Sequence, residues 1–212
     1  MKYIDGWWCP PVLSGPGKYL RRAGVIDYAL TFWQGPRQRA IQAGAHIGTF
    51  PRQLAESFTA VTCIEAEPAN YACLVRNVQR SPRITPVFGA LGATPGTMAL
   101  NVQPHSSAGH HIAVRPDLPA IVVPVCTIDG FGYDDVNAIA LDIEGYELFA
   151  LQGAAATLAR CHPLLVVEVN GCSHKYGYEA EALVAYLATY GYYQVAAYGE
   201  DRVFVSDESC ST

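Results

Sequence analysis

For most of its 212 residues the chain alternates between short apolar stretches and segments of helical periodicity, and this alternation limits the possible folds. Strands that alternate with helices form a parallel sheet whose two faces are both covered by helices. We therefore expect an α/β fold with a mostly parallel sheet. The expected strands are 40–43, 60–64, 84–88, 138–142 and 164–169, and the expected helices are 51–58, 69–78, 146–158 (with a break at Gly153) and 179–190.

Two further segments depart from this rhythm. Residues 97–102 and 121–126 are expected to form a hairpin or insertion, joined by the polar loop 104–119. Near the end of the chain, residues 192–197 and 202–205 predict a terminal antiparallel hairpin across a Gly-Glu-Asp turn.

The first part of the chain is rich in Pro, Gly and aromatic residues. Because the Trp7-Trp8 pair has a large apolar area to bury, we expect residues 1–20 to pack on the core as an ordered arm, with a lid over a site as the alternative. Helical spacing predicts a helix over 22–33. The expected organisation is an aromatic arm and helix over 1–37 and a main domain over 38–212, with the insertion at about 97–126.

Composition excludes several classes of protein. The chain is 50% hydrophobic and 16% charged, which excludes a disordered chain. A nucleic-acid binder needs a dense basic stripe, whereas only the Arg21/Arg22 and Arg37/Arg39 pairs occur here, so we expect no nucleic-acid partner. The net charge of −5 is unevenly spread: basic residues prevail before residue 84 and acidic residues after it.

The seven cysteines lack a Cys-x-x-Cys pair, and most of them fall in apolar stretches, which favours free thiols in a reducing compartment. No apolar run is long enough for a membrane span, and the first residues lack the pattern of a signal peptide. We therefore expect a cytoplasmic protein with no membrane partner. No histidine or cysteine spacing indicates a metal site.

The strongest local signal is the segment 40–50, in which a strand runs into Gly44 and Gly48 and then into a helix. Glycines allow a ligand to approach the backbone, the helix N-terminus offers free N–H groups, and Glu65, after the next strand, can accept ribose hydroxyls. These features indicate a nucleoside-containing cofactor, with a tight turn that binds nothing as the alternative. Nicotinamide dinucleotides are disfavoured because they require G-x-G-x-x-G.

Carboxylates mark the ends of two later strands. Asp142, Glu144 and Glu147 stand at a strand-to-helix junction, where they could provide a base, bind a divalent metal or favour the helix N-terminus. We expect helix capping for Glu147 and a functional role for Asp142. Glu168 ends the last parallel strand and is either functional or a polar rim residue.

Histidines gather in the polar loop, where His105, His110 and His111 accompany Ser106 and Ser107. Such a group could bind an acceptor or supply a base near neutral pH, although surface histidines are common in loops. His174, after the last parallel strand, is a further candidate.

These motifs in this order resemble the FkbM family of S-adenosylmethionine-dependent methyltransferases over about residues 38–170. The resemblance rests on Gln42-Ala43-Gly44-Ala45-His46-Ile47-Gly48, Ile64-Glu65-Ala66-Glu67-Pro68, Leu74 and Asn77, Val125-Cys126-Thr127-Ile128-Asp129, Ala140-Leu141-Asp142-Ile143-Glu144-Gly145-Tyr146-Glu147, Leu151-Gln152-Gly153-Ala154 and Pro163-Leu164-Leu165-Val166-Val167-Glu168. It implies a Rossmann-like class I methyltransferase fold with a seven-stranded sheet. The Gln42-Ala43-Gly44 turn is also similar to that of phage-encoded relatives, which suggests a viral source.

The resemblance implies S-adenosylmethionine as the cofactor and a role for each matching position. Gln42, Gly44, Ala45, His46 and Gly48 would surround the methionine end, Glu65 would hold the ribose, Gly89 and Ala90 would lie near the adenine, and Asp142 would sit beside the sulfonium. The base would be Asp142, Glu168 or a loop histidine such as His110. Acceptor contacts are expected from Ser107, His110, His111, Glu144 and His174.

Two positions depart from the family pattern: Gln42 replaces a usual acid and Ala140 replaces a frequent lysine. The expected function is O-methylation of a hydroxyl on a small molecule or glycan, and a degenerate methyltransferase fold that only binds is the alternative. The acidic second part predicts an acceptor face that disfavours polyanions.

Overall fold

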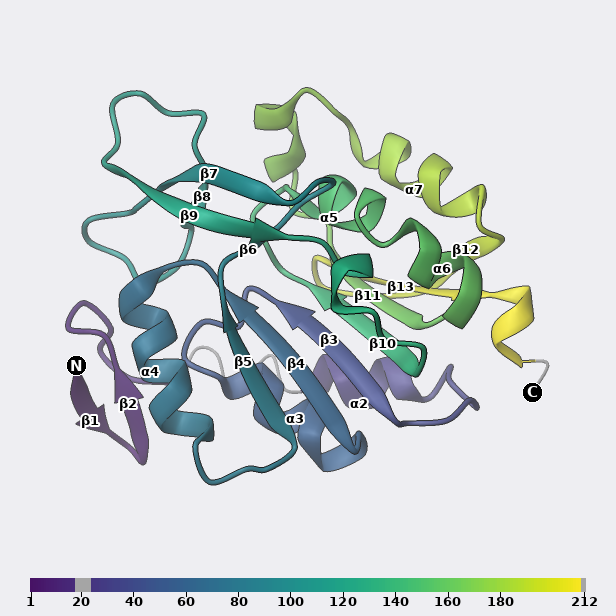
Figure 1. Ribbon diagram of the computed structural model, residues 1–212, viewed down its shortest axis with the longest axis horizontal. Coiled ribbons are helices and arrows are strands. Elements are labelled where there is room, and N and C mark those ends of the chain that lie inside the picture. Colours follow the sequence, from purple (N-terminus) through teal and green to yellow (C-terminus); the bar gives the residue numbers. More distant parts are fainter. Residues whose placement is uncertain (18–23, 211–212) are drawn as a thin grey trace.

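The central sheet has seven strands in the order β12-β13-β11-β10-β3-β4-β5 (Figure 1). In this computed structural model, which describes residues 1–17 and 24–210, strands β3, β4, β5, β10 and β11 are parallel. Strand β13 is antiparallel to β11, and β12 is antiparallel to β13. The expected seven-stranded, mostly parallel sheet with a terminal hairpin is confirmed. Its strands are β3 (Arg39–Ala43), β4 (Ala60–Glu65), β5 (Ile84–Phe88), β10 (Val136–Leu141), β11 (Leu164–Glu168), β12 (Tyr192–Tyr198) and β13 (Asp201–Ser206).

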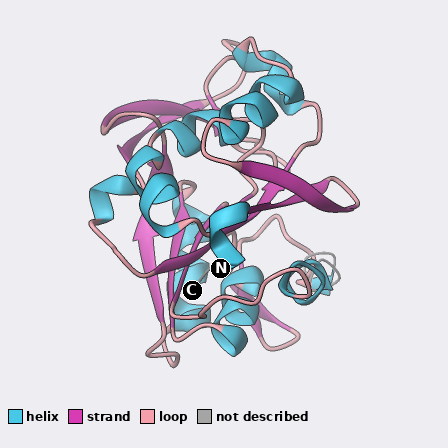
Figure 2. Ribbon diagram, turned by 90° about the vertical axis from the view of Figure 1, so that its right-hand side faces the viewer, coloured by secondary structure: helices cyan, strands magenta, loops and turns pink. Residues whose placement is uncertain are grey.

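Helices cover both faces because successive residues of each strand point to opposite sides of the sheet. In β10, Ala138 and Ala140 join one apolar cluster, whereas Ile139 and Leu141 join another. The first cluster packs under α2, α3 and α4, and the second under α5, α6 and α7; Figure 2 shows helices on both sides of the strands. The helices are α2 (Gly24–Leu30), α3 (Thr49–Ser57), α4 (Pro68–Val78), α5 (Glu147–Gln152), α6 (Ala155–Cys161) and α7 (Ala180–Ala188).

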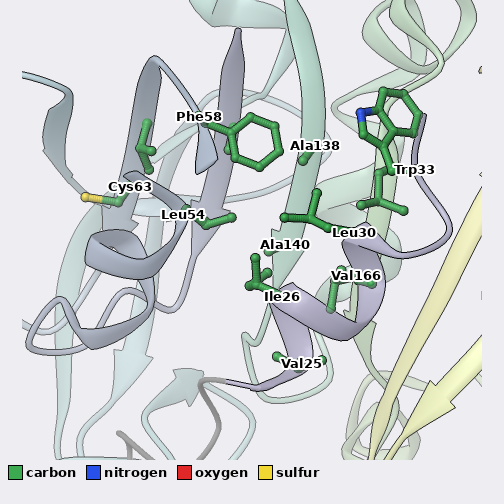
Figure 3. Close-up of a cluster of buried hydrophobic side chains, with 14 of the residues drawn as sticks. Val25, Ile26, Leu30, Trp33, Leu54, Phe58, Cys63, Ala138, Ala140 and Val166 are labelled. Atoms are coloured by element: carbon green, nitrogen blue, oxygen red, sulfur yellow. The ribbon is translucent and has the colours of Figure 1, made fainter. Parts of the chain in front are cut away.

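The helix expected over 22–33 is α2, and residue 22 lies outside the described residues, as does the Arg21/Arg22 pair. Its residues Val25, Ile26 and Leu30 are buried against Ala138, Ala140 and Val166 of the sheet, as Figure 3 shows. Although this helix precedes the first strand of the sheet, it is therefore part of the main core.

A second, four-stranded sheet follows β5. Strands β7 (Gly96–Asn101) and β9 (Ala120–Cys126) pair antiparallel, which confirms the expected hairpin. Two short strands were not expected: β6 (Ala90–Leu91), parallel to β9, and β8 (His111–Ile112), paired with β7. The order is β6-β9-β7-β8. The polar loop 104–119, which we call the histidine loop, therefore contributes the edge strand β8 to this sheet.

The arm forms a two-stranded sheet, β1 (Lys2–Ile4) and β2 (Trp7–Cys9), that packs against α4 (Figure 1). The Asn77 side chain of α4 accepts a hydrogen bond from Trp8 N–H at 2.8 Å and donates to the Trp8 carbonyl at 2.9 Å. Trp7 and Cys9 are buried with Ile47 and Cys73. The described part of the arm, residues 1–17, therefore packs on the core, and none of these residues lines the cavity described below.

Short 3-10 helices complete the described chain at Asp129–Phe131, Cys172–Tyr176 and Asp207–Cys210. The helix expected over 146–158 is divided into α5 and α6 near Gly153, as its glycine predicted. No helix among the described residues is both long and apolar enough to cross a membrane.

Candidate cofactor and acceptor site

A cavity of about 510 Å³ opens at the carboxyl ends of the parallel strands, where open α/β sheets bind their ligands. Its lining residues come from the turns after β3, β4, β5, β10 and β11 and from the histidine loop. The structure brings most of the predicted site residues together on its wall, namely Gln42, Gly44, Ala45, His46, Glu65, Gly89, Ala90, Ser107, His110, His111, Asp142, Glu144 and Glu168.

The turn after β3 follows the cavity wall closely because it carries no side chain at Gly44. This residue has a φ of +78°, and a Cβ there would collide with the carbonyl oxygen of Asp142. His46 also has a positive φ, +51°. Only glycine fits at the first position, so backbone rather than side chains borders this part of the cavity.

Glu65 ties this turn to the end of β4. Its Oε2 accepts a hydrogen bond from His46 N–H at 2.7 Å, and its Oε1 accepts one from Glu67 N–H at 2.8 Å. Burial raises the pKa of Glu65 from 4.5 to about 7, and the two backbone donors oppose that rise. Each carboxylate oxygen keeps acceptor capacity for a ligand hydroxyl.

Gln42 supplies a buried polar atom that has no partner. Its Nε2 donates to the Ala43 carbonyl at 2.9 Å, whereas its Oε1 accepts no hydrogen bond. A buried acceptor left unpaired costs free energy, so such an atom at the wall of a cavity fits a ligand that carries an N–H donor. The amino group of S-adenosylmethionine is such a donor.

The turn after β10 is tied by a second buried glutamate. Oε1 of Glu147 accepts hydrogen bonds from Ile143 N–H at 3.0 Å and Gly145 N–H at 3.1 Å, and burial raises its pKa to about 7. The expectation that Glu147 caps the following helix is wrong, because no side-chain hydrogen bond is made at the N-cap of α5. Glu147 lies in the first turn of α5 but bonds the strand-to-helix turn before it, and the N-cap position is Tyr146.

The histidine loop is held over the cavity by a side chain of α4. Asn70 Nδ2 donates to the Ser107 carbonyl at 2.8 Å. His110 Nδ1 accepts a hydrogen bond from Gln103 N–H at 3.0 Å, and burial lowers the pKa of its imidazole. In this arrangement Nδ1 of His110 holds the loop and has no lone pair left to take up a proton.

His111 has the opposite arrangement. Its Nδ1 lies 2.9 Å from the Gly109 carbonyl, which can only accept, so Nδ1 carries the proton. In the neutral ring Nε2 then holds the lone pair, and this buried atom has no hydrogen-bond partner. Of the two loop histidines that line the cavity, His111 is therefore the one with a ring nitrogen available to accept a proton.

The lining of the cavity does not include Gly48, His105 or His174. Gly48 starts α3 with a φ of +95°, and a Cβ there would press on Leu74 at 2.9 Å, so its role is close packing of α3 on α4. His174 forms an exposed pair with Glu179, with 2.8 Å between Nδ1 and Oε1. His105 is exposed in the loop.

The terminal hairpin brings residues to the cavity that the sequence did not single out. In the pairing of β11 with β13, Glu168 lies opposite Asp201, and both are buried. Asn170 donates to Glu168 Oε2 at 2.8 Å. With Asp142 and Glu144 these carboxylates make one side of the cavity acidic. Other lining residues that the sequence did not indicate are Asn70, Tyr146, Tyr198 and Glu200.

The sheet order and the helices on both faces are those of a Rossmann-like class I methyltransferase fold. The family model of the methyltransferase FkbM domain matches residues 42–193. The chain therefore belongs to the FkbM methyltransferase family, and S-adenosylmethionine is its cofactor. No curated protein is close enough in sequence to count as a match.

Similar solved structures include methyltransferase FkbM from Methylobacillus flagellatus, with a TM-score of 0.56 and 20% identity. That match covers 80% of this chain but only 43% of the longer protein. Precorrin 8W decarboxylase from Methanobacterium thermoautotrophicum has a TM-score of 0.55 and 13% identity and covers 97% and 100% of the two chains. Precorrin-6y C5,15-methyltransferase from Geobacter metallireducens has a TM-score of 0.51 and 10% identity, and the match covers 96% of each chain. At these identities the likeness shows the fold.

Among the described residues, no group of three or more His, Cys, Asp or Glu side chains is arranged to hold a metal ion. Free thiols are present at Cys9, Cys63, Cys73, Cys126, Cys161 and Cys172.

Proposed function

We propose that this chain methylates a hydroxyl oxygen of a small molecule or glycan. When bound, S-adenosylmethionine supplies an electrophilic methyl group. The observation that carries the proposal is the convergence on one cavity of a glycine turn, a buried ribose-type glutamate and strand-end carboxylates, in a chain of this family. A hydroxyl acceptor needs a base to take its proton, and this cavity offers several.

The cofactor side of the proposal assigns one task to each residue of the first turn. Glu65 would accept hydroxyl hydrogen bonds from the ribose, as an acid after the second strand does in nucleoside-binding folds. Gln42 Oε1 would accept from the amino group. Gly44, Ala45 and His46 would present backbone at the methionine end, and Gly89 and Ala90 would border the adenine.

The acceptor side is the acidic wall and the histidine loop. Asp142 follows the last residue of β10, and its backbone carbonyl lies beside Gly44. In this proposal it stands between the cofactor side and the acceptor side. It would take the hydroxyl proton or orient the hydroxyl, with Glu168 or His111 Nε2 as the other acceptors. Ser107, His110 and Glu144 would shape the acceptor pocket. Because the protein mainly positions two reactants for an in-line transfer, small displacements of these groups would be costly in rate.

The acidic wall also constrains the acceptor. Several carboxylates facing one cavity repel a polyanion and favour a neutral or cationic acceptor. A second candidate function, a degenerate fold that binds the cofactor without transfer, is favoured by Gln42 and Ala140, which replace charged residues usual in the family.

The test is incubation with methyl-labelled S-adenosylmethionine and an extract of the native host, followed by mass spectrometry of the labelled product. We expect a new methyl ether whose formation is reduced at least about 100-fold by Asp142→Asn. The matched control is Asp117→Asn, which changes an exposed carboxylate in the same way.

Label on carbon or nitrogen would contradict the proposed O-methylation. Saturable binding of S-adenosylhomocysteine with no transfer to any acceptor would favour the degenerate alternative.

A further inference from the structure

A second hollow of about 620 Å³ lies away from the cavity and shares no lining residue with it. We call it the arm groove; its lining residues come from the arm, α3, the end of α4 and the loop that leads into β5. The side chains that matter here are Tyr3, Trp8, Arg52, Arg76, Arg80 and Arg83.

The arm groove is strongly basic although the whole chain has a net charge of −5. Its four arginines face one acidic side chain, Glu56. In the part of the chain that the structure describes, the ion pairs of arginine involve Arg39 and Arg115, and none involves an arginine of the groove. Four guanidinium groups close together without carboxylate partners repel one another, so a bound anion would stabilise them.

Aromatic stacking holds two of these arginines in place. The guanidinium carbon of Arg52 lies 4.5 Å from the Trp7 ring centre, and that of Arg76 lies 4.8 Å from the Trp8 ring centre. The rings themselves are fixed, because Asn77 binds the Trp8 backbone and Trp7 is buried. A stacked guanidinium keeps its in-plane N–H donors available for an anion, and less side-chain entropy is lost on binding.

Only one of the four groove arginines makes a side-chain hydrogen bond that stabilises a helix end. Arg83 Nη1 donates to the Ala55 carbonyl at 3.0 Å near the end of α3, a common role for a basic side chain. Arg52 and Arg80, by contrast, make no hydrogen bond through their side chains to any described residue. Both side chains line the groove, so their N–H donors are available to a ligand there.

We propose that the arm groove binds a ligand that carries several phosphate or sulfate groups. Guanidinium groups match the oxygens of these anions with paired N–H donors, and a hollow of this volume has room for more than one such group. The acidic wall of the cavity disfavours the same ligand, so the anion belongs to the arm groove and not to the acceptor position. The inference stands independently of the transfer reaction.

Calorimetric titration at low salt with tripolyphosphate tests the site. A second titration uses a sulfated oligosaccharide of similar charge. We expect saturable one-to-one binding, and the tighter of the two ligands names the source of the anion. Arg80→Gln should weaken binding about fivefold and Arg76→Gln with Arg80→Gln about 25-fold, since each removes a charge-assisted contact at an exposed site.

Arg115→Gln is the matched control, because it removes one exposed positive charge outside the groove. Binding should be unchanged in this variant, and all variants should keep the wild-type melting temperature and the wild-type response to S-adenosylhomocysteine. Equal weakening by Arg80→Gln and Arg115→Gln, or no saturable binding at millimolar ligand, would overturn the proposal.

Discussion

The turns after β3 and β10 are built alike but face different surroundings. In each turn a strand end passes through residues of positive φ into a helix, and a buried glutamate accepts two backbone hydrogen bonds. Burial raises the pKa of both Glu65 and Glu147 to about 7. Only Glu65 lines the cavity; Glu147 is closed off beneath the second turn.

The comparison teaches that the same local chemistry serves binding in one turn and architecture in the other. A perturbed pKa therefore does not distinguish the two roles, because desolvation is its main cause in both places. Access to the cavity makes the distinction, and it depends on how the second sheet and the terminal hairpin surround the strand ends.

The largest effect is expected where the first turn touches the second. Gly44→Ala would place a Cβ against the Asp142 carbonyl and strain a positive φ, so we expect the free energy of unfolding to fall by at least about 3 kcal/mol. Gly132→Ala is the control, since this glycine has a φ of +67° with open space around it and should cost about 1 kcal/mol. Urea denaturation measures both. Equal losses would show that the two turns do not pack as closely as described.

Next in size is the difference between the two glutamates. Glu147→Ala should lower the free energy of unfolding by about 3 kcal/mol, because two buried N–H groups lose their acceptor. This corresponds to a fall of roughly 10 °C in melting temperature. Glu65→Ala should cost about 1 kcal/mol, since water in the cavity can replace its carboxylate. Calorimetry distinguishes the two, and a larger loss for Glu65→Ala would reverse the assignment of roles.

An element of the fold was predictable from the sequence when it depends on local residues, and not when it depends on contacts with distant segments. The strands and helices of the central sheet were predictable to within a few residues, because each depends on its own apolar pattern; Ile139 and Leu141 alternate with Ala138 and Ala140 in β10. The short strands β6 and β8 were not predictable, since two residues carry no periodicity and their pairing comes from β9 and β7.

The candidate site was predictable where motif and strand end coincide, as at Gly44, Glu65 and Asp142. Tyr198 and Asp201 reach the cavity because β13 returns beside β11, a contact between distant segments. The signal that could have indicated Asp201 is its place in the tight turn of the terminal hairpin, once the hairpin is placed beside the last parallel strand.

A smaller effect concerns pH. Deprotonated Glu65 accepts ribose hydroxyls, so affinity for S-adenosylhomocysteine should rise about tenfold between about pH 6 and pH 8 as the group passes its pKa of about 7. The free energy of unfolding should instead fall as pH rises. In the folded state Glu65 and Glu147 hold their protons up to about pH 7, whereas in the unfolded state they lose them near pH 4.5. The free energy of unfolding therefore falls between these two pH values.

Glu65→Gln should flatten the pH profile of affinity, whereas Glu147→Gln should leave that profile intact and reduce only the slope of stability. Titrations across this pH range measure the first quantity, and denaturation at each pH measures the second. A flat profile in the wild type would contradict the role of Glu65.

The smallest effect is expected at Gln42. Gln42→Met removes the unpartnered Oε1 in a side chain of similar shape, so stability should change by less than about 1 kcal/mol. Affinity for S-adenosylhomocysteine should fall about fivefold if the amino group binds this oxygen. Thermal denaturation with and without the ligand measures both quantities, and unchanged affinity would remove Gln42 from the cofactor side.

The most direct test of the account is a calorimetric titration of the wild type, Glu65→Gln and Glu147→Gln with S-adenosylhomocysteine at about pH 8. The account predicts one saturable site in the wild type, at least about 100-fold weaker binding in Glu65→Gln, and nearly wild-type binding in Glu147→Gln as long as it is folded. No binding by the wild type at millimolar ligand, or equal binding by Glu65→Gln and the wild type, would contradict it.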